Sequence, residues 1–331
     1  MDQLIDFVSQ FPQGISAGEI ESQLKLGRST LNRRLRAALA SGDLIAVGNG
    51  PARRYQPADA LVALKAYFNK PHTERPLATF KELLLESTPG LSDAALTELH
   101  DLPTYKPGKR ELGKFLIDFA CASSVLEGGT YSLLDTQALI DYGEKSAGKP
   151  LADAFLVLNH KEALEYLYDH LDLSAIYQVQ DLLTNDHNLP ELQDAPHFLP
   201  ANQRGKVREF TDVDIRLSAY MPPFRPGTTY LQECLDRIIE TARSLMPVQA
   251  AFYLLTRIPY LQPFQDGNKR TSRAMCNVPL LQAGLPPISF VDFAKQDYII
   301  SMLAFYELGD VRLAERCFVA AYKKSIARLV K

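Results

Sequence analysis

The segment YLQPFQDGNKRTSR, residues 260–273, contains the turn around which the predicted fold is built. Pro263 predicts that a helix ends at or before Gln262, because proline disfavours the helical conformation of the residue before it. Asp266-Gly267-Asn268 is a turn signal. The following residues, KRTSRAMCNVPLLQ (269–282), predict a new helix. Taken alone, these residues indicate an ordinary corner between two helices.

Three cations in the first turn of that second helix argue for more than a corner. Lys269, Arg270 and Arg273 lie where the helix dipole is already positive, which costs about 0.3–1 kcal/mol for each cation. Arg270 and Arg273 also share one helix face and repel each other. A bound anion would remove the conflict, since backbone N–H groups and guanidinium groups together hold phosphate. We therefore predict a polyphosphate site here, with Asp266 as the ligand of a Mg²⁺ ion.

The bulk composition is that of an ordinary globular protein. The 331 residues are 46% hydrophobic and 23% charged, and the length predicts two or three domains. The formal net charge of −3 excludes a protein that coats nucleic acid with a uniformly basic surface. No apolar run approaches the ~18 residues of a membrane-spanning helix and no leader peptide is visible, which predicts a cytoplasmic protein without membrane contact. The four cysteines form no CxxC motif and no histidine has zinc-ligand spacing, so we expect buried thiols and no zinc site.

Residues 1–57 predict a small N-terminal domain. Apolar residues at helical spacing indicate a first helix in residues 2–11. Ser16 and Glu19 have the spacing of a capping box and begin a second helix. Ser29 is expected to cap a third helix, with Leu31 and Leu35 facing inward. Residues 43–57 read as two strands around a Gly-Asn-Gly turn. This order is similar to a winged helix-turn-helix.

The same region carries a local basic patch. Between residues 25 and 54 there are seven Lys or Arg residues and one acid. Double-stranded DNA is the partner that such a patch on a recognition helix favours, and protein contact or dimerisation is the alternative. The predicted DNA-binding residues are Arg28, Arg33 and Arg34 on the third helix, with Arg53 and Arg54 on the wing.

The rest of the chain is predicted to be mainly helical. Residues 58–109 contain five prolines between short helical pieces and read as a helical connector. Residues 110–331 show helical periodicity throughout, with one exception. Val213, Ile215 and Leu217 alternate with polar residues, as in a short strand or hairpin.

The loop resembles the signature of the Fic family, H-P-F-x-[DE]-G-N-G-R-x-x-R. Family members usually transfer AMP from ATP to a hydroxyl group of a target protein. The resemblance implies ATP as ligand, Mg²⁺ on Asp266, phosphate contacts from Gly267, Asn268 and Lys269, and binding of the β/γ end by Arg270 and Arg273. It extends over residues 110–290 and implies a Fic-type helical domain. It also implies that Val213, Asp214 and Ile215 form a flap that docks a target segment.

A second motif, SSVLEGG, supports the resemblance. Ser123, Glu127 and Gly128 match the family's inhibitory pattern [ST]-x-x-x-E-[GN], here in a helix around residues 120–128. In such relatives the Glu forms a salt bridge with the second Arg of the signature, which here is Arg273, and blocks the γ-phosphate position. The alternative is that Glu127 is only a solvent-facing acid at a helix end.

Two positions depart from the signature. Gln262 replaces the histidine that accepts the proton of the target hydroxyl, and a neutral amide cannot act as a general base. Lys269 replaces a glycine, as in the Doc branch, whose members transfer a phosphate. By resemblance, Lys269 therefore favours γ-phosphate transfer over AMP transfer.

Three functions remain open from the sequence. The chain is a restrained AMP- or phosphate-transferring enzyme, or a catalytically inactive nucleotide sensor that regulates transcription through DNA, or a scaffold with a vestigial site. His160 is interpreted as a structural residue. The family often self-associates, so the resemblance also implies a homodimer, besides a target protein that the sequence does not name.

Overall fold

The protein is represented by a computed structural model that describes residues 3–86, 90–211, 213, 215, 217–291 and 293–329. The chain forms two compact units. The first contains Met1–Ala78, Arg216–Tyr220 and Ile299–Leu313, and the second contains Thr79–Ile215, Met221–Tyr298 and Ala314–Lys331. The domain limits expected from the sequence, 1–57, 58–109 and 110–331, stay predictions.

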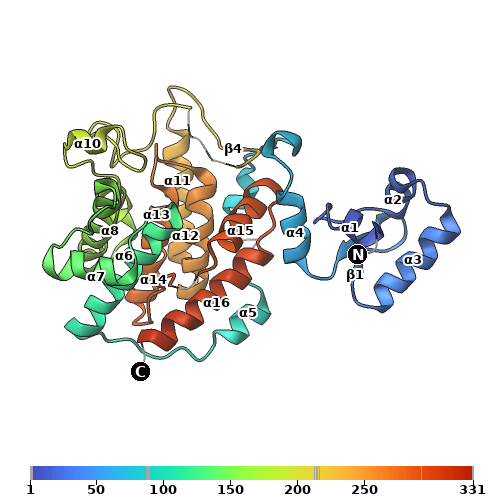
Figure 1. The fold of residues 1–331 in the computed structure, drawn as a ribbon, viewed down its shortest axis with the longest axis horizontal. Helices are drawn as coiled ribbons and strands as arrows, with labels where there is room; N and C mark the ends of the chain where they lie inside the picture. Colours follow the sequence, from blue (N-terminus) through green and yellow to red (C-terminus); the bar gives the residue numbers. More distant parts are fainter. Residues whose placement is uncertain are drawn as a thin grey trace. The chain divides into compact units, whose positions relative to one another are not determined.

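The first unit begins with the predicted three helices and hairpin. These are α1 (Gln3–Val8), α2 (Ala17–Leu24), α3 (Arg28–Ala40), β1 (Leu44–Val47) and β2 (Arg54–Pro57), with β1 and β2 antiparallel (Figure 1). The capping box is present, since Ser16 N–H donates to Glu19 Oε2 at 2.8 Å and Glu19 N–H to Ser16 Oγ at 3.3 Å. The predicted cap at Ser29 is wrong. Helix α3 already begins at Arg28, because Gly27 takes the extended N-cap conformation.

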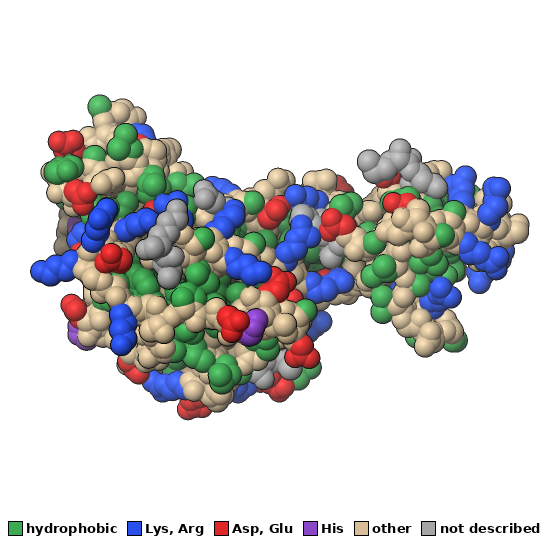
Figure 2. Space-filling view, turned by 90° about the horizontal axis from the view of Figure 1, so that it is seen from below, with side chains coloured by type: hydrophobic (Ala, Val, Ile, Leu, Met, Phe, Trp, Pro, Cys, Tyr) green, Lys and Arg blue, Asp and Glu red, His purple; other side chains and the backbone are tan. Residues whose placement is uncertain are grey.

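One apolar core holds these elements together. Leu4, Ile20, Leu31 and Leu35 are buried in it, and Tyr55 of β2 completes it. A backbone bridge between Ile15 and Tyr55 fixes the hairpin to the segment before α2. The charged residues of α3 therefore remain outside. Figure 2 shows Lys and Arg side chains gathered on this unit at the end where α3 lies.

Elsewhere in the first unit, a buried ion pair joins the segment that contains Arg75 to the segment Ile299–Leu313. Arg75 Nε lies 3.1 Å from Glu307 Oε2, and both side chains are almost fully buried. The Glu307 carboxylate also accepts the N–H of Ala219 at 2.8 Å. Other elements here are α4 (Ala60–Phe68) and the short 3₁₀ turns η1 (Gly50–Ala52) and η2 (His72–Glu74).

The second unit is almost entirely helical, as predicted. Helix α12 packs against α11, α13 and α14, and lies in the middle of this unit in Figure 1. Its residues from 250 to 261 are all buried.

Of the described residues, none belongs to a helix that is both long and apolar enough to cross a membrane. The helices are α5 (Asp93–Glu98), α6 (Lys109–Glu127), α7 (Leu133–Tyr142), α8 (Leu151–Asp169), α9 (Ile176–Leu183), α10 (Pro190–Gln193), α11 (Tyr230–Ser244), α12 (Pro247–Leu261), α13 (Asn268–Met275) and α14 (Asn277–Gln282), with 3₁₀ turns η3 (Glu82–Leu85) and η4 (Leu173–Ala175).

Two further helices, α15 (Lys295–Leu308) and α16 (Arg312–Leu329), complete the chain. Strands β3 (Ala78–Thr79) and β4 (Tyr220–Met221) form a second two-stranded sheet. Of the four cysteines expected to be buried, Cys121, Cys234 and Cys276 are buried, whereas Cys317 is only half-buried.

The strand predicted around residues 213–217 is wrong in position. Val213 and Ile215 have no strand conformation, and Asp214 lies outside the described residues. Leu217 has a φ of 65°, which interrupts an extended run. The strand forms a few residues later, at β4, because its partner is β3, far away in the sequence.

Candidate anion-binding site

Gln262 closes the C-terminal end of α12 with its own side chain. The carbonyl of Pro259 would normally accept the N–H of residue 263, but that residue is a proline and has none. Gln262 Nε2 donates to this carbonyl instead, at 2.7 Å. The residue adopts the left-handed conformation, with φ 51°, and is 6% exposed. Gln262 thus serves as a helix cap.

Asn268 holds the loop closed from the other side. Its Nδ2 donates to Gln262 Oε1 and to the carbonyl of Phe264, both at 2.8 Å, and its Oδ1 accepts the N–H of Phe264 at 2.9 Å. Both ends of the Gln262 amide are therefore occupied. The side-chain amides of Gln262 and Asn268 therefore hold the loop in shape.

Gly267 is required for steric reasons. Its φ is +79°, and a Cβ at this position would lie 2.8 Å from Thr184 Cγ2 of the segment after α9. Any other residue would meet both backbone strain and this contact. The close approach places the start of α13 against residues 183–185.

Arg270 is buried at the start of α13 and is 1% exposed. Its Nη1 donates to the carbonyl of Leu183 at 2.6 Å, and its Nη2 lies 3.3 Å from Asp266 Oδ2. The Asp266 side chain is 43% exposed, and its Oδ1 accepts the N–H of Gly267 at 2.5 Å. One guanidinium edge and one carboxylate therefore meet at the helix N-terminus.

Arg273 lies in the last turn of α13, because the helix already begins at Asn268, so its predicted place in the first turn is wrong; its side chain is completely buried. Its Nε donates to Ser123 Oγ at 2.9 Å and its Nη1 to Tyr298 Oη at 3.3 Å. Its Nη2 lies 2.5 Å from Glu127 Oε1. Helix α6, through Ser123 and Glu127, and the segment that contains Tyr298 thus converge on one guanidinium group.

Glu127 supplies the negative charge that the cations of α13 need. As the last residue of α6, its carboxylate lies at the negative end of its own helix dipole, where an acid is unfavourable. Its side chain is 9% exposed and contacts Arg273, with Lys269 Nζ 3.8 Å from Oε2. Burial alone would raise the pKa of Glu127, but the charges of Arg273, Lys269 and Arg270 outweigh it and hold that pKa well below its usual range. An acid at the C-terminal end of α6 and buried cations on α13 are each unfavourable alone. Their pairing stabilises both.

His160 lies behind this pair, on α8. Its Nε2 is 2.8 Å from Ser123 Oγ, and its Nδ1 is 2.6 Å from the carbonyl of Leu156. Burial, together with the positive charges of Arg270 and Arg273, lowers the pKa of His160 to about 3. A neutral imidazole that orients Ser123 agrees with the structural interpretation of this residue.

Sequence reasoning missed His197, which the fold brings into the field of the same charges. The N–H of Leu199 donates to the carbonyl of Thr184 at 2.8 Å, and this fixes the segment beside residues 183–185. Burial first, and then the charge of Arg270, lower the pKa of His197. His197 is far from the loop in sequence, and no motif marks it.

The structure brings most predicted site residues together. Gln262, Asp266, Gly267, Asn268, Lys269, Arg270 and Arg273 lie in one loop and helix turn, and Ser123 and Glu127 contact Arg273. Gly128, with φ 108°, ends α6. Among the described residues, no group of three or more His, Cys, Asp or Glu side chains could bind a metal.

The basic residues of the first unit are partly neutralised. Arg28 Nη1 lies 2.6 Å from Glu21 Oε2, and Arg54 Nη1 lies 3.5 Å from Glu19 Oε2. Arg53 lies over the ring of Tyr55. Arg33 is exposed on α3, and Arg34 is half-buried.

The chain is similar in sequence to known proteins. Residues 170–280 match the Fic/DOC family. The protein adenylyltransferase Fic of Drosophila persimilis is 24% identical over 265 residues, which are 79% of this chain and 49% of that protein. The protein adenylyltransferase fic-1 of Caenorhabditis elegans is 26% identical over 211 residues, 62% of this chain and 39% of that protein. This chain therefore spans half or less of the length of these two relatives.

Solved structures show the same fold. A Fic-1 structure from Caenorhabditis elegans has a TM-score of 0.53 at 20% identity, covering 72% of this chain and 68% of that one. A Fic domain containing signaling protein from Bacteroides thetaiotaomicron has a TM-score of 0.53 at 18% identity, covering 71% of this chain and 95% of that one. The mainly helical fold is therefore a Fic fold.

Proposed function

We propose that this chain, which contains a Fic/DOC family domain, binds Mg-ATP at the start of α13 and is restrained there by Glu127. The observation that carries the proposal is the buried ion pair between Glu127 and Arg273, with Lys269 nearby. Arg273 is completely buried, and a buried guanidinium group needs an anion beside it. Glu127 provides it in this state, and a terminal phosphate of ATP would take its place.

The remaining contacts suit a polyphosphate. Arg270 and Arg273 offer guanidinium groups, and the N-terminus of α13 offers backbone N–H groups. Asp266 is the carboxylate on the loop with an exposed side chain. A Mg²⁺ ion usually takes one or two carboxylates together with substrate phosphates, so this donor set fits Mg²⁺. The ion would neutralise phosphate charge.

Transfer of AMP or phosphate to a protein hydroxyl would be slow. Gln262 has no titrating group, and both ends of its amide are already hydrogen-bonded. Loss of a general base costs about 10²–10⁴ in rate. Positioning and electrostatic stabilisation remain, and they account for most of phosphoryl transfer. We infer a weak transferase that is restrained by Glu127.

The second candidate is a catalytically inactive, nucleotide-sensing transcriptional regulator. The role of Gln262 as a helix cap favours it, because both ends of the side-chain amide are already hydrogen-bonded within the loop. The order of three helices and a hairpin in the first unit, read as a winged helix-turn-helix, supports DNA binding by Arg28, Arg33, Arg34, Arg53 and Arg54. A homodimer and a cytoplasmic location belong to both candidates as predictions.

The test is incubation with α- or γ-labelled ATP and Mg²⁺, combined with calorimetric measurement of ATP binding. The variants are Glu127→Gly, Gln262→His and both together. Glu127→Gln is the matched control, since it removes the charge without making the helix end flexible. Tighter ATP binding in both Glu127 variants is expected, because each releases Arg273 for phosphate.

The outcomes separate the candidates. If the Glu127→Gly variant transfers label to protein, the chain is an enzyme that works without a histidine at position 262. If label is transferred only after Gln262→His, or if every variant binds ATP without transferring label, the regulator is favoured. Absence of ATP binding in wild type and all variants would refute both.

A further inference from the structure

Gln180 of α9 carries a buried amide that contacts the loop of the anion site. The residue is 0% exposed. Its Nε2 donates to the carbonyl of Asp266 at 3.0 Å and to Thr184 Oγ1 at 3.3 Å, and its Oε1 accepts the N–H of Gly205 at 2.6 Å. A side-chain amide has two donor hydrogens and one acceptor oxygen. Both hydrogens and the oxygen are therefore used.

The neighbours of Gln180 decide which end of its amide faces Asp266. The backbone N–H of Gly205 needs an acceptor, so the amide oxygen lies on that side. The NH₂ group then faces the backbone carbonyl of Asp266, which needs a donor. A glutamate of the same shape would meet this carbonyl with an oxygen atom. The two backbone groups together therefore suit a glutamine and exclude an ionised acid.

The bond from Gln180 fixes the peptide group between Asp266 and Gly267. In a planar trans peptide the C=O and N–H groups point in opposite directions. The carbonyl is turned to the buried Gln180, so the N–H of Gly267 points the other way, to Oδ1 of the Asp266 carboxylate at 2.5 Å. That carboxylate is exposed and lies beside Arg270. The N–H of Gly267 is thus on the anion-binding side of the loop.

Gly267 does not fix this orientation by itself. Glycine populates positive and negative φ about equally, so the peptide group before it turns over at little steric cost. After such a turn, the carbonyl oxygen of Asp266 would face the anion in place of the N–H. Helix N-termini bind phosphate through N–H groups, and a carbonyl oxygen repels it. The peptide therefore needs a partner that holds it, and Gln180 is that partner.

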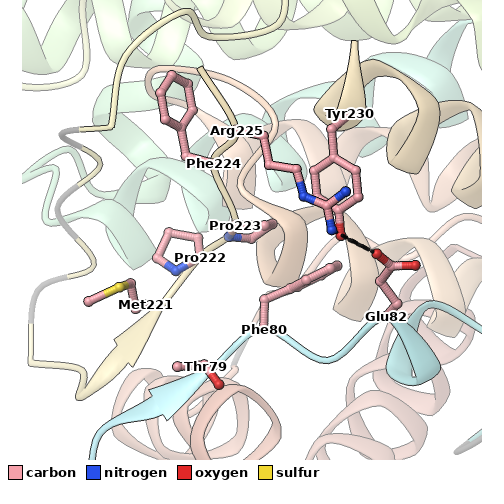
Figure 3. A pocket seen from close by; sticks show the side chains of 9 residues that line it. All are labelled: Thr79, Phe80, Glu82, Met221, Pro222, Pro223, Phe224, Arg225 and Tyr230. Atoms are coloured by element: carbon pink, nitrogen blue, oxygen red, sulfur yellow. Dashed lines mark hydrogen bonds and ion pairs between the residues drawn. The ribbon is translucent and has the colours of Figure 1, made fainter. Parts of the chain in front are cut away.

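The other end of the Gln180 amide holds the segment that leads to Arg208. Gly205 begins this segment with a φ of 67°. Three residues later, the backbone N–H of Arg208 donates to the carbonyl of Pro263 at 2.9 Å. Arg208 Nη2 donates to the carbonyl of Pro223, which Figure 3 shows at the wall of a hollow of ≈ 350 Å³. Gln180 and Arg208 thus hold the loop at two separate carbonyl groups.

We propose that Gln180 is a positioning residue of the anion site, which keeps the peptide between Asp266 and Gly267 turned so that its N–H and the Asp266 carboxylate face the bound Mg-ATP. The inference rests on the proposed function and adds to it a residue of another helix. Without the Nε2 donor the peptide turns over, and the loop presents an oxygen to the phosphate. Mg-ATP binding should then weaken about tenfold, because a hydrogen bond to a charged group is lost.

The test observes this one peptide directly, since residues 266–267 are the only Asp-Gly dipeptide in the sequence. Cell-free synthesis with ¹³C at the aspartate carbonyl and ¹⁵N in glycine gives a protein with one cross-peak in an HNCO spectrum. Gln180→Glu, at about pH 8, keeps an acceptor for Gly205 and removes the donor to Asp266. Its cross-peak is expected to shift in ¹⁵N or to broaden. Gln178→Glu, at an exposed position of the same helix, is the matched control and should leave the cross-peak unchanged.

Gln180→Met is the second variant, because a buried glutamate can unfold the protein. Methionine removes the hydrogen bonds without adding a charge, and it should alter the same cross-peak. Calorimetry in a Glu127→Gln background then measures Mg-ATP binding. Each Gln180 variant is expected to bind about tenfold more weakly than this parent, and the Gln178→Glu control equally well.

The two readouts separate the inference from the proposed function. The inference is overturned if the Gln180 variants keep the cross-peak of the parent, or if they bind Mg-ATP as tightly as the parent does. Absence of Mg-ATP binding in the parent would instead refute the proposed function. A loss of stability alone would not move the cross-peak of a single peptide in the folded protein.

Discussion

Gln262 Nε2 lies 2.7 Å from the carbonyl oxygen of Pro259 and replaces the backbone N–H that Pro263 lacks. The side chain at the position of the family's histidine therefore stabilises a helix end. This hydrogen bond explains how the loop keeps its shape at a helix end that is followed by proline.

Gln262→Ala should destabilise the protein. It leaves the Pro259 carbonyl without its donor and Asn268 Nδ2 without one acceptor, and an unsatisfied buried group costs about 1–3 kcal/mol. Urea unfolding would measure the loss. Gln193→Ala, at an exposed position of α10, is the control and should change stability little. Equal stability of Gln262→Ala and wild type would contradict the capping role.

Gly267→Ala should lower both stability and ATP affinity. The left-handed backbone costs an L-residue about 1–2 kcal/mol, and the new Cβ would lie 2.8 Å from Thr184 Cγ2. Thr184→Ser removes that methyl group and keeps the hydroxyl that donates to the Gln180 carbonyl. The double variant should thus recover part of the stability. If the double variant recovers no stability, the contact with Thr184 does not contribute to the loss.

His160 should make the protein acid-sensitive. Its pKa is lowered to about 3 in the folded protein, against about 6.5 when unfolded. The unfolded state therefore binds a proton first as the pH falls below about 6.5, and stability decreases by up to about 1.4 kcal/mol per pH unit. Above that pH the contribution is fully present.

Chemical denaturation of wild type and His160→Gln between pH 7 and pH 4.5 would show this. The variant should lack the decrease in unfolding free energy that protonation of His160 causes. The difference in unfolding free energy, variant minus wild type, should therefore increase as the pH falls. His100→Gln, at an exposed histidine, should follow wild type. Parallel curves for wild type and His160→Gln would refute the assignment.

Lys269→Gly should change which phosphate is transferred, in a Glu127→Gly background. Lys269 Nζ lies near Glu127 and its side chain is 46% exposed, so its removal should cost less than about 1 kcal/mol of stability. With Lys269 present, label from γ-phosphate is expected, and with glycine, label from α-phosphate. Transfer of α-label with Lys269 in place would exclude the phosphate-transfer hypothesis.

Arg33→Ala with Arg34→Ala should weaken binding to duplex DNA and reduce its salt dependence. Each lost phosphate contact lowers the slope of log K against log salt by about 0.9. Lys109→Ala with Arg110→Ala removes two cations from the second unit and is the control. Absence of duplex binding by wild type at low salt would leave protein contact as the role of the basic patch.

Much of the fold was predictable from local signals. The capping box at Ser16, the inward leucines of α3 and the helix end before Pro263 depend on neighbouring residues, so the sequence showed them directly. The cap at Ser29 failed because Gly27 was equally able to begin the helix. The strand near Val213 failed because strands β3 and β4 pair over a long sequence distance.

The sequence by itself determined that Lys269 and Arg270 stand at the start of α13 and that a glutamine, residue 262, precedes Pro263. Only the tertiary structure decided what these features contact. It placed Glu127 at 2.5 Å from Arg273, turned the Gln262 amide to Pro259 and Asn268, and brought His197 into the field of Arg270. The physical reason is that burial and charge pairing act through space between distant segments, whereas turn and helix signals act along the chain.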